Sequence, residues 1–255
     1  MTLQNKRGQI TIFIIIGILI LVAISVLFIV SKDQSQVDSQ DVVDYLQISN
    51  NVESYVSSCL KTTTRAAILH IEKQGGYFQL PENSFSDKPV YFDRGEILAP
   101  TKETVEEQLS KQIEEELDGC IAEFSYFEDQ GIIISYEEKE VISELLDNHV
   151  NVKLVWPLDI KQDRAETKME MFQISEPTKL LPLLETAHSF INEENTEALC
   201  VSCLTMDTFA NGFKSKIATS PEGYFIITLQ DFQSEINNQH EQLRFVNIYE
   251  LKEEN

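Results

Sequence analysis

The chain has 255 residues, 42% of them hydrophobic, and its 42 acidic residues outnumber its 20 basic residues, for a formal net charge of −22. Such an excess of negative charge repels anionic surfaces, and the sequence contains no stripe of Lys and Arg of the kind that nucleic-acid recognition requires. Composition therefore excludes nucleic acid as a partner. The length allows one large hydrophobic core or two small ones.

The first thirty residues predict a membrane anchor. Residues 1–8 form a polar leader whose charged side chains are Lys6 and Arg7, and residues 10–30 carry no charge and no proline. About 20 apolar residues allow a helix to cross the hydrocarbon core, and a basic leader stays on the cytoplasmic side. A cleaved secretory signal fits less well, because its apolar run is usually about 7–15 residues. We expect a transmembrane helix at 9–30 with the lipid bilayer as its partner.

The remainder of the chain is then expected to be extracytoplasmic, in a single-pass cell-membrane protein. Without Lys6 and Arg7, 18 basic residues remain against 42 acidic ones, so this part is near −24. Residues 31–40 are polar and predict a stalk. The domain that follows spans 41–255, either as one body or as two lobes at 41–175 and 176–255.

Helices dominate the first part of this domain. Apolar residues recur with a period near 3.6 over 42–74, which predicts an amphipathic helix, and Gly75-Gly76 is expected to end it. A loop with a small hairpin at 90–98 follows. A second amphipathic helix is predicted from Thr101 to Phe124, because Thr101 can cap it and its apolar residues form one stripe.

Strands and short helices are predicted in the second part. The period changes to two over 131–175, which indicates three or four antiparallel strands. Two helices are then expected at 177–192 and 198–210, followed by strands at 213–219, 224–229 and 243–249. Because helices precede and follow the strands without regular alternation, we predict an α+β fold with amphipathic helices packed on antiparallel sheets.

The cysteines are Cys59, Cys120, Cys200 and Cys203. An even number of cysteines in an exported domain is typical of disulfides, and four cysteines allow three pairings. We favour a bond from Cys59 to Cys120 between two predicted helices, and a local bond from Cys200 to Cys203. A zinc site remains an alternative, but it would require all four cysteines to converge.

The Cys200-x-x-Cys203 spacing also fits a thiol oxidoreductase. Such pairs usually lie at the start of a helix that follows a strand, in surroundings that favour a thiolate. Here Glu193, Glu194 and Glu197 precede the pair, and their charge disfavours a thiolate. The residues therefore favour structural disulfides and keep redox chemistry as an alternative.

No other pattern of residues points to a catalytic or metal site. The four histidines are scattered without a metal-binding spacing, and no nucleophile elbow, phosphate-binding glycine loop or dinucleotide motif occurs. We expect no catalytic residue, no cofactor and no bound metal, and hence a protein that is not an enzyme.

The leader resembles the class III signal peptide of archaeal type IV pilin-like proteins. The resemblance rests on Lys6-Arg7-Gly8-Gln9-Ile10-Thr11 directly before the apolar run. It implies that a prepilin-type peptidase cuts between Gly8 and Gln9 and that pilin-like subunits are partners. Phe13 departs from the family pattern, which usually has a glutamate at that position.

The domain also resembles singly anchored surface proteins of small-genome archaea. Three segments carry this resemblance, namely residues 52–59, 74–81 and 200–204. It implies a surface location and a cysteine framework, without an activity. We therefore expect a pilin-like structural protein for adhesion or envelope assembly, with an anchored enzyme or a thiol oxidoreductase using Cys200 and Cys203 as the alternative.

Overall fold

The computed structural model describes residues 18, 20–22, 39–163, 165–194 and 198–250. The chain divides into two compact units, residues 1–47 and 48–255. The predicted leader, the processing residues Gly8 and Gln9 and most of the predicted membrane helix and stalk lie outside the described residues. Among the residues that are described, no helix is both long and apolar enough to span a membrane.

The first long helix of the domain, α2 (Ser39–Lys73), ends at the predicted glycine pair. Gly75 and Gly76 have φ of +57° and +83°, and the Gly76 N–H donates to the Ile71 carbonyl at 2.8 Å. Glycine adopts these angles without the steric penalty of a Cβ atom, and the bond satisfies a carbonyl that the helix leaves open. The predicted helix and its stop are confirmed.

The second long helix, α3 (Lys102–Ile121), is shorter than predicted. Its N-terminus matches the expected cap, because the Thr101 hydroxyl accepts the Thr104 N–H at 3.2 Å. The predicted end at Phe124 is wrong, since Ala122 takes a left-handed conformation with φ of 47° and stops the helix. A 3₁₀ turn, η1 (Ala122–Phe124), and the short helix α4 (Ser125–Glu128) follow.

The predicted antiparallel strands of 131–175 form one sheet. Its strands are β4 (Ile133–Tyr136), β5 (Glu140–Leu146), β6 (His149–Gln162) and β7 (Ala165–Pro177). Strand β6 pairs with β7 along one edge and with β4 and β5 along the other. Alternate side chains of β5 and β6 are buried, as expected for a sheet with one covered face.

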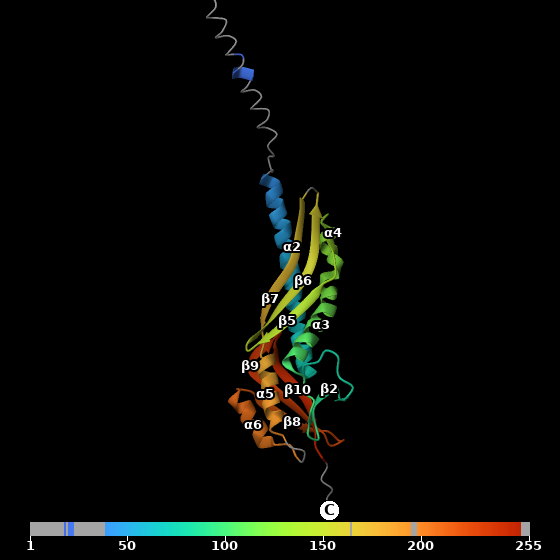
Figure 1. Ribbon diagram of the computed structural model, residues 1–255, viewed down its shortest axis with the longest axis vertical. Helices are drawn as coiled ribbons and strands as arrows, with labels where there is room; N and C mark the ends of the chain where they lie inside the picture. The colour runs from blue at the N-terminus through green and yellow to red at the C-terminus, as the bar shows by residue number, and fades with distance from the viewer. Residues whose placement is uncertain (1–17, 19, 23–38, 164, 195–197, 251–255) are drawn as a thin grey trace, which may run out of the picture. The chain divides into compact units, whose positions relative to one another are not determined.

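Helix α3 covers the outer edge of β5, and Figure 1 shows the two elements side by side. Three side chains spaced four residues apart on α3 accept backbone N–H groups spaced two residues apart on β5. The pairs are Glu114 with Val141 at 3.4 Å, Ser110 with Ser143 at 2.9 Å, and Glu106 with Leu145 at 2.7 Å. These bonds satisfy donors that an open sheet edge would expose to other chains.

A second sheet has six strands in the order β1-β2-β10-β9-β8, with β3 paired to β2. Their bounds are β1 (Ser84–Phe85), β2 (Lys88–Asp93), β3 (Glu96–Ile97), β8 (Lys214–Thr219), β9 (Phe225–Ile236) and β10 (Gln239–Ile248). The β2–β3 pair is the predicted hairpin. The prediction of antiparallel sheets is wrong for one pairing of this sheet, because β2 and β10 pair in parallel.

A large hydrophobic core joins the helices to both sheets. It contains Val56 and Leu60 of α2, Trp156 of β6, Leu183 of helix α5 (Leu180–Asn192) and Phe245 of β10. The segments 41–175 and 176–255, predicted as possible lobes, both contribute to it. The α+β class is confirmed.

Candidate disulfide site at the start of helix α6

The Cys200–Cys203 pair lies at the N-terminus of helix α6 (Val201–Ala210), which follows α5. The two cysteines form a disulfide with Cα atoms 5.3 Å apart. Cys200 is the residue that caps the helix, and Cys203 lies in its first turn. The position at a helix start is therefore typical of a redox pair, but the segment before it connects two helices and does not follow a strand.

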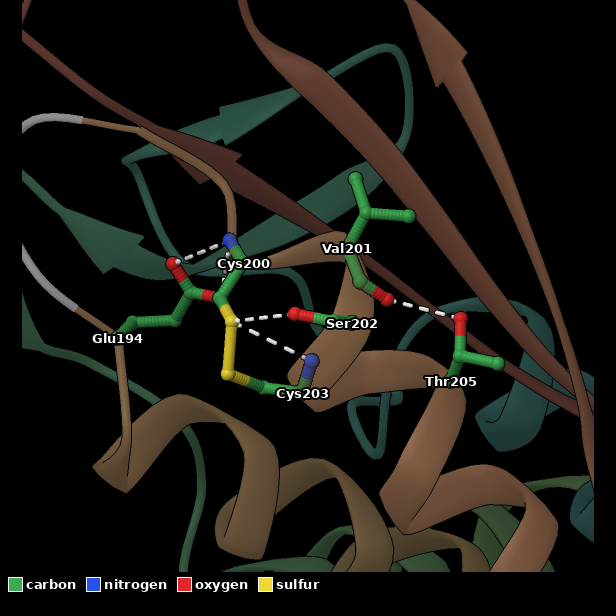
Figure 2. The surroundings of a disulfide bond; sticks show 6 residues. All are labelled: Glu194, Cys200, Val201, Ser202, Cys203 and Thr205. Atoms are coloured by element: carbon green, nitrogen blue, oxygen red, sulfur yellow. Dashed lines mark hydrogen bonds between the residues drawn. A yellow bond between two sulfur atoms is a disulfide. The ribbon is translucent and has the colours of Figure 1, made fainter.

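Three polar groups surround the Cys200 side of this bond, as Figure 2 shows. The Cys203 N–H donates to the Cys200 sulfur at 3.2 Å, and the Ser202 hydroxyl lies 3.5 Å from the same sulfur. The Glu194 carboxylate accepts the Cys200 N–H at 3.1 Å. Burial raises the pKa of Glu194. Because the Cys200 sulfur accepts the Cys203 N–H, it takes the place of the hydroxyl or carboxylate oxygen that usually caps a helix.

The disulfide is half-buried, and apolar side chains are exposed on the same short helix. Val201, Met206 and Phe209 are 54%, 72% and 85% exposed. Leu204 of the same helix is fully buried and anchors it to the core. The disulfide is therefore within reach of solvent and of another polypeptide.

The Cys59–Cys120 disulfide has a different environment. It joins α2 to the last turn of α3 with Cα atoms 5.6 Å apart, and Cys59 is only 4% exposed. The Tyr55 hydroxyl contacts the Cys120 and Ile121 carbonyl oxygens at 3.1 Å each, which adds a polar partner at the end of α3. This bond is a staple between two core helices.

All four cysteines are therefore paired, and the pairs are the two that the sequence favours. The cysteines are divided between two disulfides and do not gather around one centre. Across the described ranges, no group of three or more His, Cys, Asp and Glu side chains is placed to hold a metal ion.

Sequence reasoning missed a buried polar cluster beneath the C-terminal end of α2. Glu72 and Glu241 are 0% and 1% exposed. Glu241 accepts bonds of 2.6 Å from the hydroxyls of Thr178 and Ser234 and from the Lys179 N–H. Burial and the neighbouring Glu241 carboxylate raise the pKa of Glu72 well above its usual range.

One signal of this cluster exists in the sequence. Glu72 follows Ile68 by four residues, so it falls on the apolar stripe of the predicted helix, where a carboxylate is unusual. The other members of the cluster lie in β9, β10 and the segment before α5, and no local pattern connects those elements to α2.

We compared the chain with protein-family models, with curated proteins and with solved structures, and nothing matches.

Proposed function

We propose that this chain is a membrane-anchored, extracytoplasmic structural protein of the pilin-like type, acting in adhesion or envelope assembly. The observation that carries the proposal is the pairing of all four cysteines in disulfides. Disulfides persist in oxidising compartments outside the cytoplasm. The apolar run at 10–30 behind Lys6 and Arg7 supplies the route to that location.

Protease treatment of intact cells tests the location. We expect externally added protease to degrade the acidic domain while a cytoplasmic control protein survives. Protection of the domain in intact cells, with degradation after lysis, would contradict the proposal.

Mass measurement of the purified protein tests the processing that the resemblance implies. The mature chain is expected to begin at Gln9, and Gly8→Val is expected to retain the leader because a branched side chain replaces the residue at the cleavage point. Gly17→Val is the matched control, since it changes a glycine inside the apolar run. A wild-type chain that retains Met1 would remove the pilin-like part of the proposal and leave an uncleaved anchor.

A second candidate function is thiol–disulfide exchange at Cys200 and Cys203. It is favoured by the Cys200 sulfur at the helix N-terminus, where the Cys203 N–H and Ser202 hydroxyl would stabilise a thiolate. A substrate thiolate would attack the Cys203 sulfur, forming a mixed disulfide and releasing Cys200 as a thiolate. Attack of that thiolate on the Cys203 sulfur would reform the bond and release the substrate thiol unchanged.

A net redox reaction requires the substrate to supply a second thiol. That thiol attacks the substrate sulfur in the mixed disulfide, so that the substrate leaves as a disulfide and Cys203 leaves as a thiolate. Two electrons pass from the substrate dithiol to the cysteine pair in this step.

Stepwise reduction of the folded chain separates the two functions. Thiol buffers of increasing reducing strength, followed by alkylation and mass spectrometry, report each pair separately. An exchange-active pair is expected to open at Cys200 and Cys203 long before Cys59 and Cys120, which are the internal control. Resistance of both pairs to the same conditions would assign both a structural role.

A further inference from the structure

A pocket of about 610 Å³ lies where the end of α2 meets strands β2 and β10. It is lined by Lys73 of α2, Lys88 of β2 and Arg244 of β10, with His70 three residues before Lys73. Asp87 is the one acidic side chain among the described residues that line it. This local excess of positive charge, which we call the basic pocket, occurs in a chain with a net charge of −22.

The glycine stop of α2 brings these cations together. A Cβ atom on Gly75 would lie 2.6 Å from the Arg244 carbonyl oxygen and 2.6 Å from a ring carbon of Pro89. Only glycine allows the helix end to approach β10 and β2 this closely. The close approach places Lys73, Arg244 and Lys88 around one open pocket.

Two tight turns complete the rim of the basic pocket. Ser86 and Asp87 connect β1 to β2 with φ of 49° and 60°, and Asn237 and Asn238 connect β9 to β10 with φ of 51° and 60°. Both pairs of angles are typical of the two-residue hairpin turns that match strand twist. Asp87 and Asn237 line the pocket, so both hairpin turns contribute side chains to its rim.

The three cations have neutral partners. The Lys73 ammonium donates to the Gln239 side-chain oxygen at 2.8 Å, and the Lys88 ammonium donates to the Ser86 carbonyl at 2.6 Å. The Arg244 guanidinium donates to the Gln242 side-chain oxygen through Nε and Nη2, at 3.2 and 2.9 Å. Among the described residues, none of the three has a carboxylate within ion-pair distance. The three charges are therefore held by neutral hydrogen-bond partners, and Lys73 also interacts electrostatically with the buried Glu72.

Negative groups of α2 compete little for these cations. The carbonyls of Ile71 and Glu72 at the helix end already accept the N–H groups of Gly76 and Gly75, at 2.8 and 3.3 Å. The Glu72 side chain is fully buried, and one of its oxygens accepts the Gln242 N–H at 3.2 Å. Burial raises its pKa, which favours the neutral form.

We propose that the basic pocket binds the phosphate group of a small phosphate ester. A guanidinium matches two oxygens of a phosphate, and ammonium groups add point charges that orient around the remaining oxygens. The pocket is open to solvent, and its volume of about 610 Å³ leaves room for more than the ion alone. This proposal stands independently of the structural role proposed above.

Lysine labelling of the full-length chain in neutral detergent tests the site without a substitution. Glycerol 3-phosphate is the probe, with inorganic phosphate, glycerol and sodium chloride as comparisons at one ionic strength. Glycerol 3-phosphate is expected to slow acetylation of Lys73 and Lys88 in a saturable manner and to leave Lys153 unchanged. Equal protection by chloride or glycerol, protection by inorganic phosphate alone, or equal slowing at Lys153 would overturn the proposal.

Titration calorimetry of variants gives a second measurement. Lys88→Met and Arg244→Met keep an unbranched apolar chain and remove one charge each, and Lys153→Met is the matched control outside the pocket. Each pocket variant is expected to weaken binding of glycerol 3-phosphate about tenfold or more, because a charge-assisted hydrogen bond is lost. Unchanged affinity in both pocket variants, or an equal loss in the control, would overturn the assignment. Labelling of the wild-type chain decides the matter if a pocket variant does not fold.

Discussion

Removal of the Cys59–Cys120 disulfide is expected to cost far more stability than removal of the Cys200–Cys203 disulfide. The first bond closes a loop with a sequence separation of 61 residues, and the second closes one with a separation of 3. In the chain-entropy model these loops correspond to about 4 kcal/mol for the long one and less than about 2 kcal/mol for the short one. The difference arises because the long bond restricts more conformations of the unfolded chain.

Denaturant unfolding followed by tryptophan fluorescence measures both losses. The chain has a single tryptophan, Trp156, which is 2% exposed, and its ring centroid lies 5.3 Å from that of Phe124. Its fluorescence emission therefore reports on the core. With an m-value of about 4 kcal/mol/M in guanidinium chloride, a loss of about 4 kcal/mol in the free energy of unfolding lowers the denaturation midpoint by about 1 M. Cys200→Ala/Cys203→Ala is the matched control and is expected to shift the midpoint by less than half as much.

Single variants test whether the two cysteines act as one unit. Cys59→Ala and Cys120→Ala are each expected to open the same loop, so the double variant should cost little more than either alone. Additive losses, or equal losses for the long-range and the local disulfide, would refute the reasoning.

Three further predictions concern single side chains. Glu72→Gln should gain stability relative to wild type as pH rises above about 4.5. The pKa of Glu72 is raised in the fold, so the folded wild-type chain keeps a proton that the unfolded chain releases. Unfolding curves at several pH values would contradict this if the difference in stability stayed constant. Ala122→Gly should stabilise the fold by about 1 kcal/mol, since the left-handed conformation at φ of 47° no longer carries a Cβ atom, and an unchanged melting temperature would argue against it. Ser110→Ala should destabilise the fold by about 1–2 kcal/mol, because the Ser143 N–H loses its acceptor, and faster amide exchange at Ser143 is the specific sign.

Much of the fold follows from local sequence pattern. The 3.6-residue period of α2, the glycine pair that ends it, and the alternation of β5 and β6 each depend on residues close together in the chain. Helix and strand periodicity decides which face of an element is buried before any partner is specified. The α+β class and most element positions were therefore predictable, as was the preferred pairing of the cysteines.

Other features depend on segments that are distant in sequence. The parallel pairing of β2 with β10, the left-handed turn at Ala122 and the edge of β5 covered by α3 have no local signature. The basic pocket and the buried Glu72–Glu241 pair also have no local signature, because each combines residues from α2 and β10. Periodicity shows that a side chain faces inward, whereas its neighbours and the balance of charge around it are decided when the helices and sheets pack together.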